Sequence, residues 1–175
     1  MNYDRHLYIL RAIEGLREAK SWTGKTHVQK TLFLTQAIGF NELPFKFVLY
    51  RHGPYSFEVD QELEEMVSYG AIDVVPQGQY GPTLLPGEGR GFPEALGKAE
   101  PKGLDSISKV ASFVGSRNVV ALESLATATW VVREENVHGE EAVLKRLKEL
   151  KPHLEDEIAK KGVQDSDELQ RVLSA

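Results

Sequence analysis

Residues 56–70 read SFEVDQELEEMVSYG, and this stretch decides the fold prediction. Ser56 is a favoured first residue for a helix, and Gly70 is a favoured stop after one. Between them the apolar side chains recur at helical spacing, at Phe57, Val59, Leu63, Met66 and Val67. The stretch therefore predicts a helix over residues 56–69, and this helix carries carboxylates but no Lys or Arg.

The flanking segments predict the elements around this acidic helix. Apolar periodicity predicts helices over residues 3–20 and 26–38, the second opened by a capping box of Thr26 and Gln29. Residues 45–50, FKFVLY, predict a strand, and residues 51–55 predict a turn. Residues 71–75 and 83–85 enclose a Gly-rich turn and predict a hairpin. This order of elements is that of a winged helix-turn-helix unit, with the acidic helix in the place of the DNA-reading helix and the hairpin in the place of the wing.

The remainder of the chain predicts helices. Residues 87–103 are rich in Gly and Pro, which is typical of a loop or linker. Further helices are expected over residues 106–115, 119–135, 140–150, 155–161 and 167–173, and that over 119–135 should be the most buried. The expected fold is α+β and mostly helical: a winged-helix-like unit over residues 1–86, packed on a helical segment over residues 104–175 to form one compact domain.

Composition restricts the function. The 175 residues include no Cys, which excludes disulfides and thiol catalysis. No signal-peptide pattern and no apolar run of the ~20 residues that a membrane span needs are visible, so we expect a cytoplasmic protein without a membrane partner. The net charge of −5 disfavours a sequence-independent nucleic-acid binder.

No motif predicts catalysis, a cofactor or a metal. Gly24-Lys25-Thr26 resembles the end of a phosphate-binding loop, but residue 19 is Ala where that loop needs Gly. The five His residues lack metal-ligand spacing, and no nucleophile motif is present. An enzyme with a dispersed site remains an alternative, which a deep polar pocket around Tyr50 and His52 would favour.

Charge suggests a partner. Carboxylates on a DNA-reading helix would be repelled by phosphates, so the acidic helix is either a solvated face or a docking surface for a basic protein partner, formed by Glu58, Glu62, Glu64 and Glu65. The N-terminal segment is basic, and the alternative function is a transcription regulator whose phosphate contacts would be Arg17, Lys20, Lys25 and Lys30. Opposite charges on one chain also permit a homodimer.

Several stretches, which include residues 58–63 and 70–72, resemble the sequences of known bacterial families. Residues 28–34, VQKTLFL, resemble the LQKLLYL helix of Panacea (SocA-like antitoxin) domains and of the YwgA-like proteins. Residues 50–56 resemble the glycine–proline turn of these families, through Tyr50, His52, Gly53, Pro54 and Tyr55. Residues 122–130 and 147–152 are closer to the YwgA-like group. The resemblance implies a winged-helix-like fold, no catalysis, and an antitoxin or adaptor that binds a partner protein.

Overall fold

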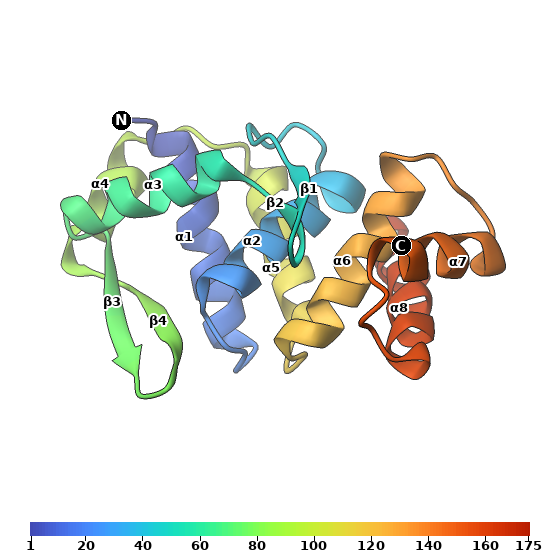
Figure 1. Ribbon diagram of the computed structural model, residues 1–175. Helices are drawn as coiled ribbons and strands as arrows, with labels where there is room; N and C mark the ends of the chain where they lie inside the picture. Colours follow the sequence, from blue (N-terminus) through green and yellow to red (C-terminus); the bar gives the residue numbers. More distant parts are fainter.

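The computed structural model describes all residues, 1–175, and the fold is α+β and mostly helical. Eight α-helices are accompanied by two separate antiparallel hairpins (Figure 1). The helices are α1 (Tyr3–Glu18), α2 (Lys25–Leu34), α3 (Phe57–Ser68), α4 (Gly91–Leu96), α5 (Pro101–Val114), α6 (Val119–Arg133), α7 (Glu140–Leu150) and α8 (Asp156–Ser174). The hairpin strands are β1 (Val48–Tyr50) with β2 (Gly53–Tyr55), and β3 (Ile72–Gln77) with β4 (Tyr80–Pro86). A π-helical turn η1 (Thr35–Gly39) extends α2, and a 3₁₀ turn η2 (Glu88–Arg90) precedes α4.

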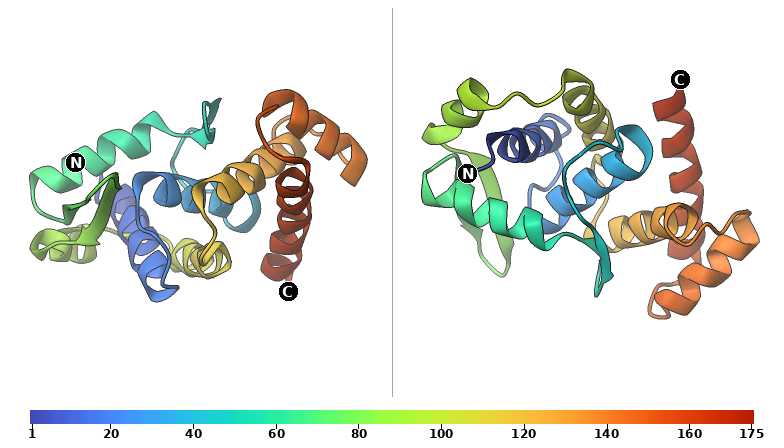
Figure 2. Two further views of the ribbon diagram at one scale, coloured as in Figure 1. Left: turned by 60° about the horizontal axis from the view of Figure 1, so that its bottom comes forward. Right: turned by 90° about the horizontal axis from the view of Figure 1, so that it is seen from above.

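Two apolar clusters form the core, and they meet on α6. The larger contains 27 buried residues and fills the space among α1, α2, α3, α5 and the first half of α6. The smaller joins the second half of α6 to α7 and α8. Every residue from Leu122 to Thr129 is buried, but the prediction that this helix is the most buried is wrong, because eight of the ten residues of α2 are buried against nine of fifteen in α6. Figure 2 shows α6 reaching from the central helices to the C-terminal pair α7 and α8.

The close crossing of α6 and α8 depends on Gly162. A Cβ added there would lie 2.0 Å from the Ser124 hydroxyl and 2.8 Å from the α6 backbone. The sequence predicts two short helices over residues 155–161 and 167–173, but this prediction is wrong, because α8 is continuous through Gly162. Packing against α6 outweighs the low helix propensity of glycine.

The predicted order of elements in the N-terminal unit is present. α3 begins after Ser56, whose hydroxyl accepts a hydrogen bond from the Val59 amide at 3.3 Å, and ends before Gly70, which adopts a φ of +75°. The β3–β4 hairpin follows with Val74 opposite Leu84. The predicted strand over residues 45–50 is shorter than expected: β1 covers only its end and pairs with β2, in the segment predicted to be a turn.

Two local predictions are wrong. The expected capping box of Thr26 and Gln29 is not formed, because the Gln29 side chain bonds to Ser56 on a neighbouring element and α2 has no side-chain cap. Residues 87–103 are not simply a loop, because they include η2, α4 and the start of α5, which begins at Pro101 rather than at residue 106. This segment lies against α1, where the Glu100 amide donates to the Tyr8 hydroxyl at 3.0 Å.

None of the helices combines the length and the apolar character needed to cross a lipid bilayer.

Candidate functional site

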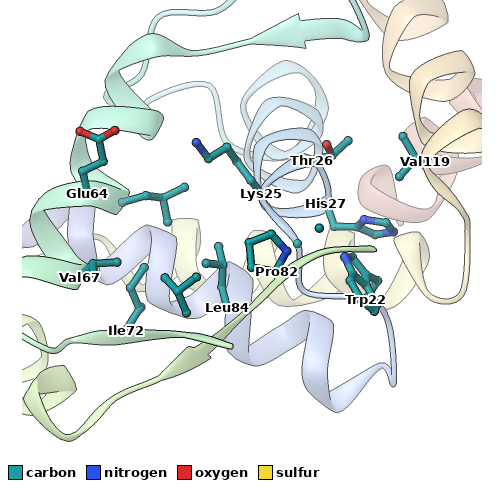
Figure 3. Close-up of a pocket in the computed structure, with 14 residues that line it drawn as sticks. Trp22, Lys25, Thr26, His27, Glu64, Val67, Ile72, Pro82, Leu84 and Val119 are labelled. Atoms are coloured by element: carbon teal, nitrogen blue, oxygen red, sulfur yellow. The ribbon is translucent and has the colours of Figure 1, made fainter. Parts of the chain in front are cut away.

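A groove of about 540 Å³ lies between α3, the β3–β4 hairpin and the N-terminus of α2, and we call it the α3–hairpin groove (Figure 3). Its floor is formed by the buried side chains of Leu63, Ile72 and Leu84. Its half-exposed walls, between 38% and 45% accessible, are formed by Trp22, Val67, Val74 and Val119, with Pro82 beside them. Apolar side chains that are gathered yet left open to solvent make this groove a candidate site.

The end of the groove at Trp22 is fixed by short polar contacts. The Thr23 hydroxyl donates to the Leu84 carbonyl at 2.8 Å, and the Leu84 amide donates to the Thr23 carbonyl at 3.0 Å. These two bonds tie the α1–α2 loop to β4. A Cβ on Gly24 would lie 2.3 Å from the Trp22 indole nitrogen, so a glycine is needed for Trp22 to lie over the start of α2.

The hairpin wall follows from strand alternation. Residues two apart on a strand face the same side, so Ile72 and Val74 of β3 line the groove together. Val74 lies opposite Leu84 in the antiparallel register, and Pro82 lies two residues before Leu84 on β4. The hairpin therefore presents one apolar face to α3, and Figure 3 shows Ile72 and Leu84 lying between Val67 of this helix and Pro82.

The polar groups of the groove are few. Lys25 is paired with Asp60 of α3. His27 is buried, and its Nε2 donates to the Arg117 carbonyl at 2.9 Å. Burial lowers the pKa of His27 below its ordinary value of 6.5, so the ring is neutral at pH 7. Glu64 at the rim is exposed and forms no ion pair, which makes it the one charge in the groove without a partner in this chain.

The predicted acidic face of α3 is not one surface, and this prediction is wrong for most of its members. Glu62 is buried and accepts from Arg5 at 3.0 Å and contacts His6 Nε2 at 2.8 Å. Glu58 accepts from Arg5 at 3.2 Å, and Glu65 lies 3.3 Å from His6 Nε2. The helix turns these carboxylates towards α1, because residues three or four apart share a face.

The glycine–proline turn over residues 50–56 is held in place by side chains of α2, and we call this arrangement the clasp. The Gln29 amide donates to the Ser56 carbonyl and accepts from the Ser56 amide, both at 2.9 Å. Lys30 Nζ donates to the Pro54 carbonyl at 2.7 Å. Gln29 and Lys30 of α2 therefore hold the backbone of the glycine–proline turn.

The clasp is completed from α6 and from the end of α7. Lys151 Nζ donates to the Tyr50 carbonyl at 3.0 Å and to the Arg51 carbonyl, and lies 3.2 Å from Glu123 Oε1. Gly53 has a φ of +88°, and a Cβ there would lie 2.9 Å from the Thr127 hydroxyl. The turn is thus pressed against α6. His52 Nδ1 is 3.6 Å from Glu123 Oε2, and the His52 side chain is largely exposed.

A polar pocket of about 320 Å³ does adjoin Tyr50 and His52. This is the feature that would favour an enzyme. Gln29 and Lys30 line it, but both are already bonded to the turn. No hydrogen bond joins a hydroxyl of this pocket to a basic side chain, and the buried polar groups serve the clasp.

The predicted phosphate contacts do not form one patch. Arg17 and Lys20 are exposed at the end of α1. Lys25 is paired with Asp60 on the groove rim. Lys30 is only 2% exposed and bonded to Pro54, so its prediction as a phosphate contact is wrong.

Sequence reasoning missed the groove itself. Trp22, Val74 and Val119 come from a loop, a strand and the start of a late helix, and only the fold brings them together. A tryptophan two residues before a glycine in a short loop was the one local signal.

Comparison with protein-family models and with curated protein sequences gives no match for this chain. The resemblance to the Panacea and YwgA-like families therefore rests on the motifs alone.

Proposed function

We propose that this chain is a non-catalytic, winged-helix-like protein-binding module of the antitoxin or adaptor kind, and that its α3–hairpin groove holds an apolar segment of the partner. The observation that carries the proposal is the ring of half-exposed apolar side chains around a buried apolar floor. Covering such side chains on binding stabilises a complex by about 25 cal/mol for each Å² removed from water.

The chemistry of the lining favours a peptide segment over a small metabolite. Small-molecule sites combine an apolar wall with several polar groups that fix the ligand's orientation. Here His27 is neutral and bonded to a backbone carbonyl, and Lys25 is bound to Asp60. One free carboxylate, Glu64, remains. This supports apolar side chains as the main contact.

The same carboxylate specifies the charge of the partner. A Lys or Arg beside the apolar segment would meet Glu64 at the rim, where complementary charge adds specificity. The net charge of −5 also favours approach by a basic partner. The proposed occupant is therefore a partner segment with apolar side chains and one basic side chain.

A library of random linear peptides displayed on phage tests this proposal. Selection on the immobilised chain should enrich peptides with apolar residues and a Lys or Arg. Val67→Glu, at a position 42% exposed in the groove, should weaken the selected peptides at least ~10-fold, which corresponds to about 1.4 kcal/mol.

The matched control is Val172→Glu. Val172 is 47% exposed on α8, outside the groove, so the same substitution there should leave peptide affinity unchanged. Equal losses in the two variants, or no enrichment at all, would contradict the proposal. A gel shift with DNA at low salt distinguishes this proposal from the alternative of a DNA-binding regulator. Retardation of the DNA that is abolished by replacing Arg17 and Lys20 would favour the alternative.

A further inference from the structure

A second constellation lies between α1 and α3, away from the groove. His6 on α1 is fully buried and faces Glu62 and Glu65 on α3. These two carboxylates are three residues apart, so they share one face of the helix. One ligand atom from each residue can be chosen so that all three lie within 4.8 Å of one another. The sequence has no metal motif, and only the packing of α1 on α3 gathers these groups.

The separations of these atoms are close to those of ligands around a single ion. His6 Nε2 lies 2.8 Å from Glu62 Oε2 and 3.3 Å from Glu65 Oε2. Nitrogen and oxygen ligands lie ~2.0–2.2 Å from a tetrahedral Zn²⁺, which places neighbouring ligand atoms about 3.4 Å apart, so the 2.8 Å pair would have to widen by roughly half an ångström. Small movements of the two carboxylates would therefore admit an ion.

The surrounding contacts orient all three groups. Tyr69 OH lies 2.9 Å from His6 Nδ1, on the opposite side of the ring from the carboxylates. Arg5 donates to Glu62 Oε1 at 3.0 Å, which leaves Oε2 facing His6. An outer hydrogen bond to the far histidine nitrogen and to the second carboxylate oxygen is the usual support for metal ligands.

The local charge is also suited to a cation. Glu58, Glu62 and Glu65 carry three negative charges. Arg5 and the N-terminal amino group, 3.8 Å from Glu65 Oε1, carry two positive charges. Without counting His6, the sum of these charges is 2 − 3 = −1. A single N–H on Nε2 also faces two carboxylates, and it cannot satisfy both with good geometry.

We propose that His6, Glu62 and Glu65 bind one divalent first-row metal ion, with Zn²⁺ as the probe that tests it. His6 would bind through Nε2 and donate its Nδ1 proton to the Tyr69 hydroxyl. Glu65 is about one-third exposed, so it supplies the entry path and leaves the remaining ligand position to water. The bound ion would join α1 to α3 and stabilise the folded state.

Calorimetric titration of the full chain with Zn²⁺ tests the site, with Glu65→Gln as the variant. Glu65 is near the surface, so this change keeps the His6–Glu62 contact and the fold. We expect saturable binding of one ion per chain, and at least ~10-fold weaker binding in Glu65→Gln, because even outer-shell partners are worth ~10–100-fold in affinity. Glu64→Gln, the exposed neighbour, is the control and should bind Zn²⁺ like the unaltered chain.

Nitrogen NMR of His6 gives an independent readout. With Zn²⁺ bound, Nε2 should hold the metal and Nδ1 should carry the ring proton, and any proton that Nε2 carries in the metal-free protein is released to solvent. Absence of saturable binding, equal affinity in Glu65→Gln, or a His6 ring that does not respond to Zn²⁺ would overturn the proposal and leave the cluster as an ion pair that fastens α1 to α3.

Discussion

Lys30 is the residue whose replacement tests the clasp most sharply. Its side chain is 2% exposed, and its ammonium donates to the Pro54 carbonyl. Burial lowers the pKa of Lys30 from 10.5 to about 8, although nearby Glu123 opposes the shift. Because the folded state releases this proton at lower pH than the unfolded state, the free energy of unfolding should rise with pH between about 8 and 10.

The size of this rise follows from the two pKa values. A difference of about 2.5 pH units (10.5 − 8) corresponds to roughly 3 kcal/mol at ~1.4 kcal/mol per unit. Lys30→Met removes the titrating group and retains much of the volume, so the free energy of unfolding of the variant should lack this rise. The difference between the two proteins should grow by about 2–3 kcal/mol from pH 7 to pH 10.

Urea unfolding at a series of pH values measures this difference. Lys25→Met is the matched control: Lys25 is about half exposed, and its replacement should give a pH profile parallel to that of the unaltered protein. The range ends at pH 10, because burial raises the pKa of Tyr55 and of Tyr69 to about 12, and unfolded tyrosines ionise earlier. Parallel profiles for Lys30→Met and the unaltered protein would show that Lys30 does not cause the rise of the free energy of unfolding with pH.

Three further predictions concern packing, the clasp and acid stability. Gly162→Ala should lower the free energy of unfolding in urea by about 1–3 kcal/mol, because the added Cβ would overlap α6. The control Gly91→Ala places its Cβ in open space and should leave the free energy of unfolding unchanged or raise it. Gln29→Ala should cost about 1–3 kcal/mol, because it leaves the buried Ser56 amide unpaired and removes one of the two hydrogen bonds to the Ser56 carbonyl, and exposed Gln61→Ala should cost little in the same measurement. His27 has a lowered pKa in the folded state, so its stabilising contribution should be lost as pH falls below about 6.5, and His27→Gln should show a smaller acid loss in thermal unfolding.

Local patterns were sufficient to predict most helices. α7 lies over the predicted residues 140–150, and α3 is bounded by Ser56 and Gly70 as expected. These boundaries depend on caps and periodicity, which act over a few residues. The break predicted in α8 failed because the packing of Gly162 on α6 is a tertiary effect that no local pattern contains.

Charge patterns were a poorer guide to the site. The carboxylates of α3 suggested an exposed face, but α1 brings Arg5 and His6 against Glu58, Glu62 and Glu65. A helical pattern shows which residues share a face, not what that face meets. The same limit applies to Lys30, which looked available for phosphate and is enclosed by the turn.

The groove was beyond sequence reasoning for a different reason. Its walls come from four separated parts of the chain, and each contributes only one or two apolar residues. Single exposed apolar residues are common on protein surfaces, so none of them stands out in the sequence. Their significance depends on the fold that places them around one floor.

Reversal of charge across the groove rim tests the proposal that the α3–hairpin groove binds a partner segment whose basic side chain meets Glu64. A selected peptide and its Lys- or Arg-to-Glu counterpart would be measured by calorimetry against the unaltered chain and against Glu64→Lys. Each single change should weaken binding and the two changes together should restore it, because the proposed rim contact is an ion pair with Glu64. Losses that merely add in the doubly changed pair would contradict it.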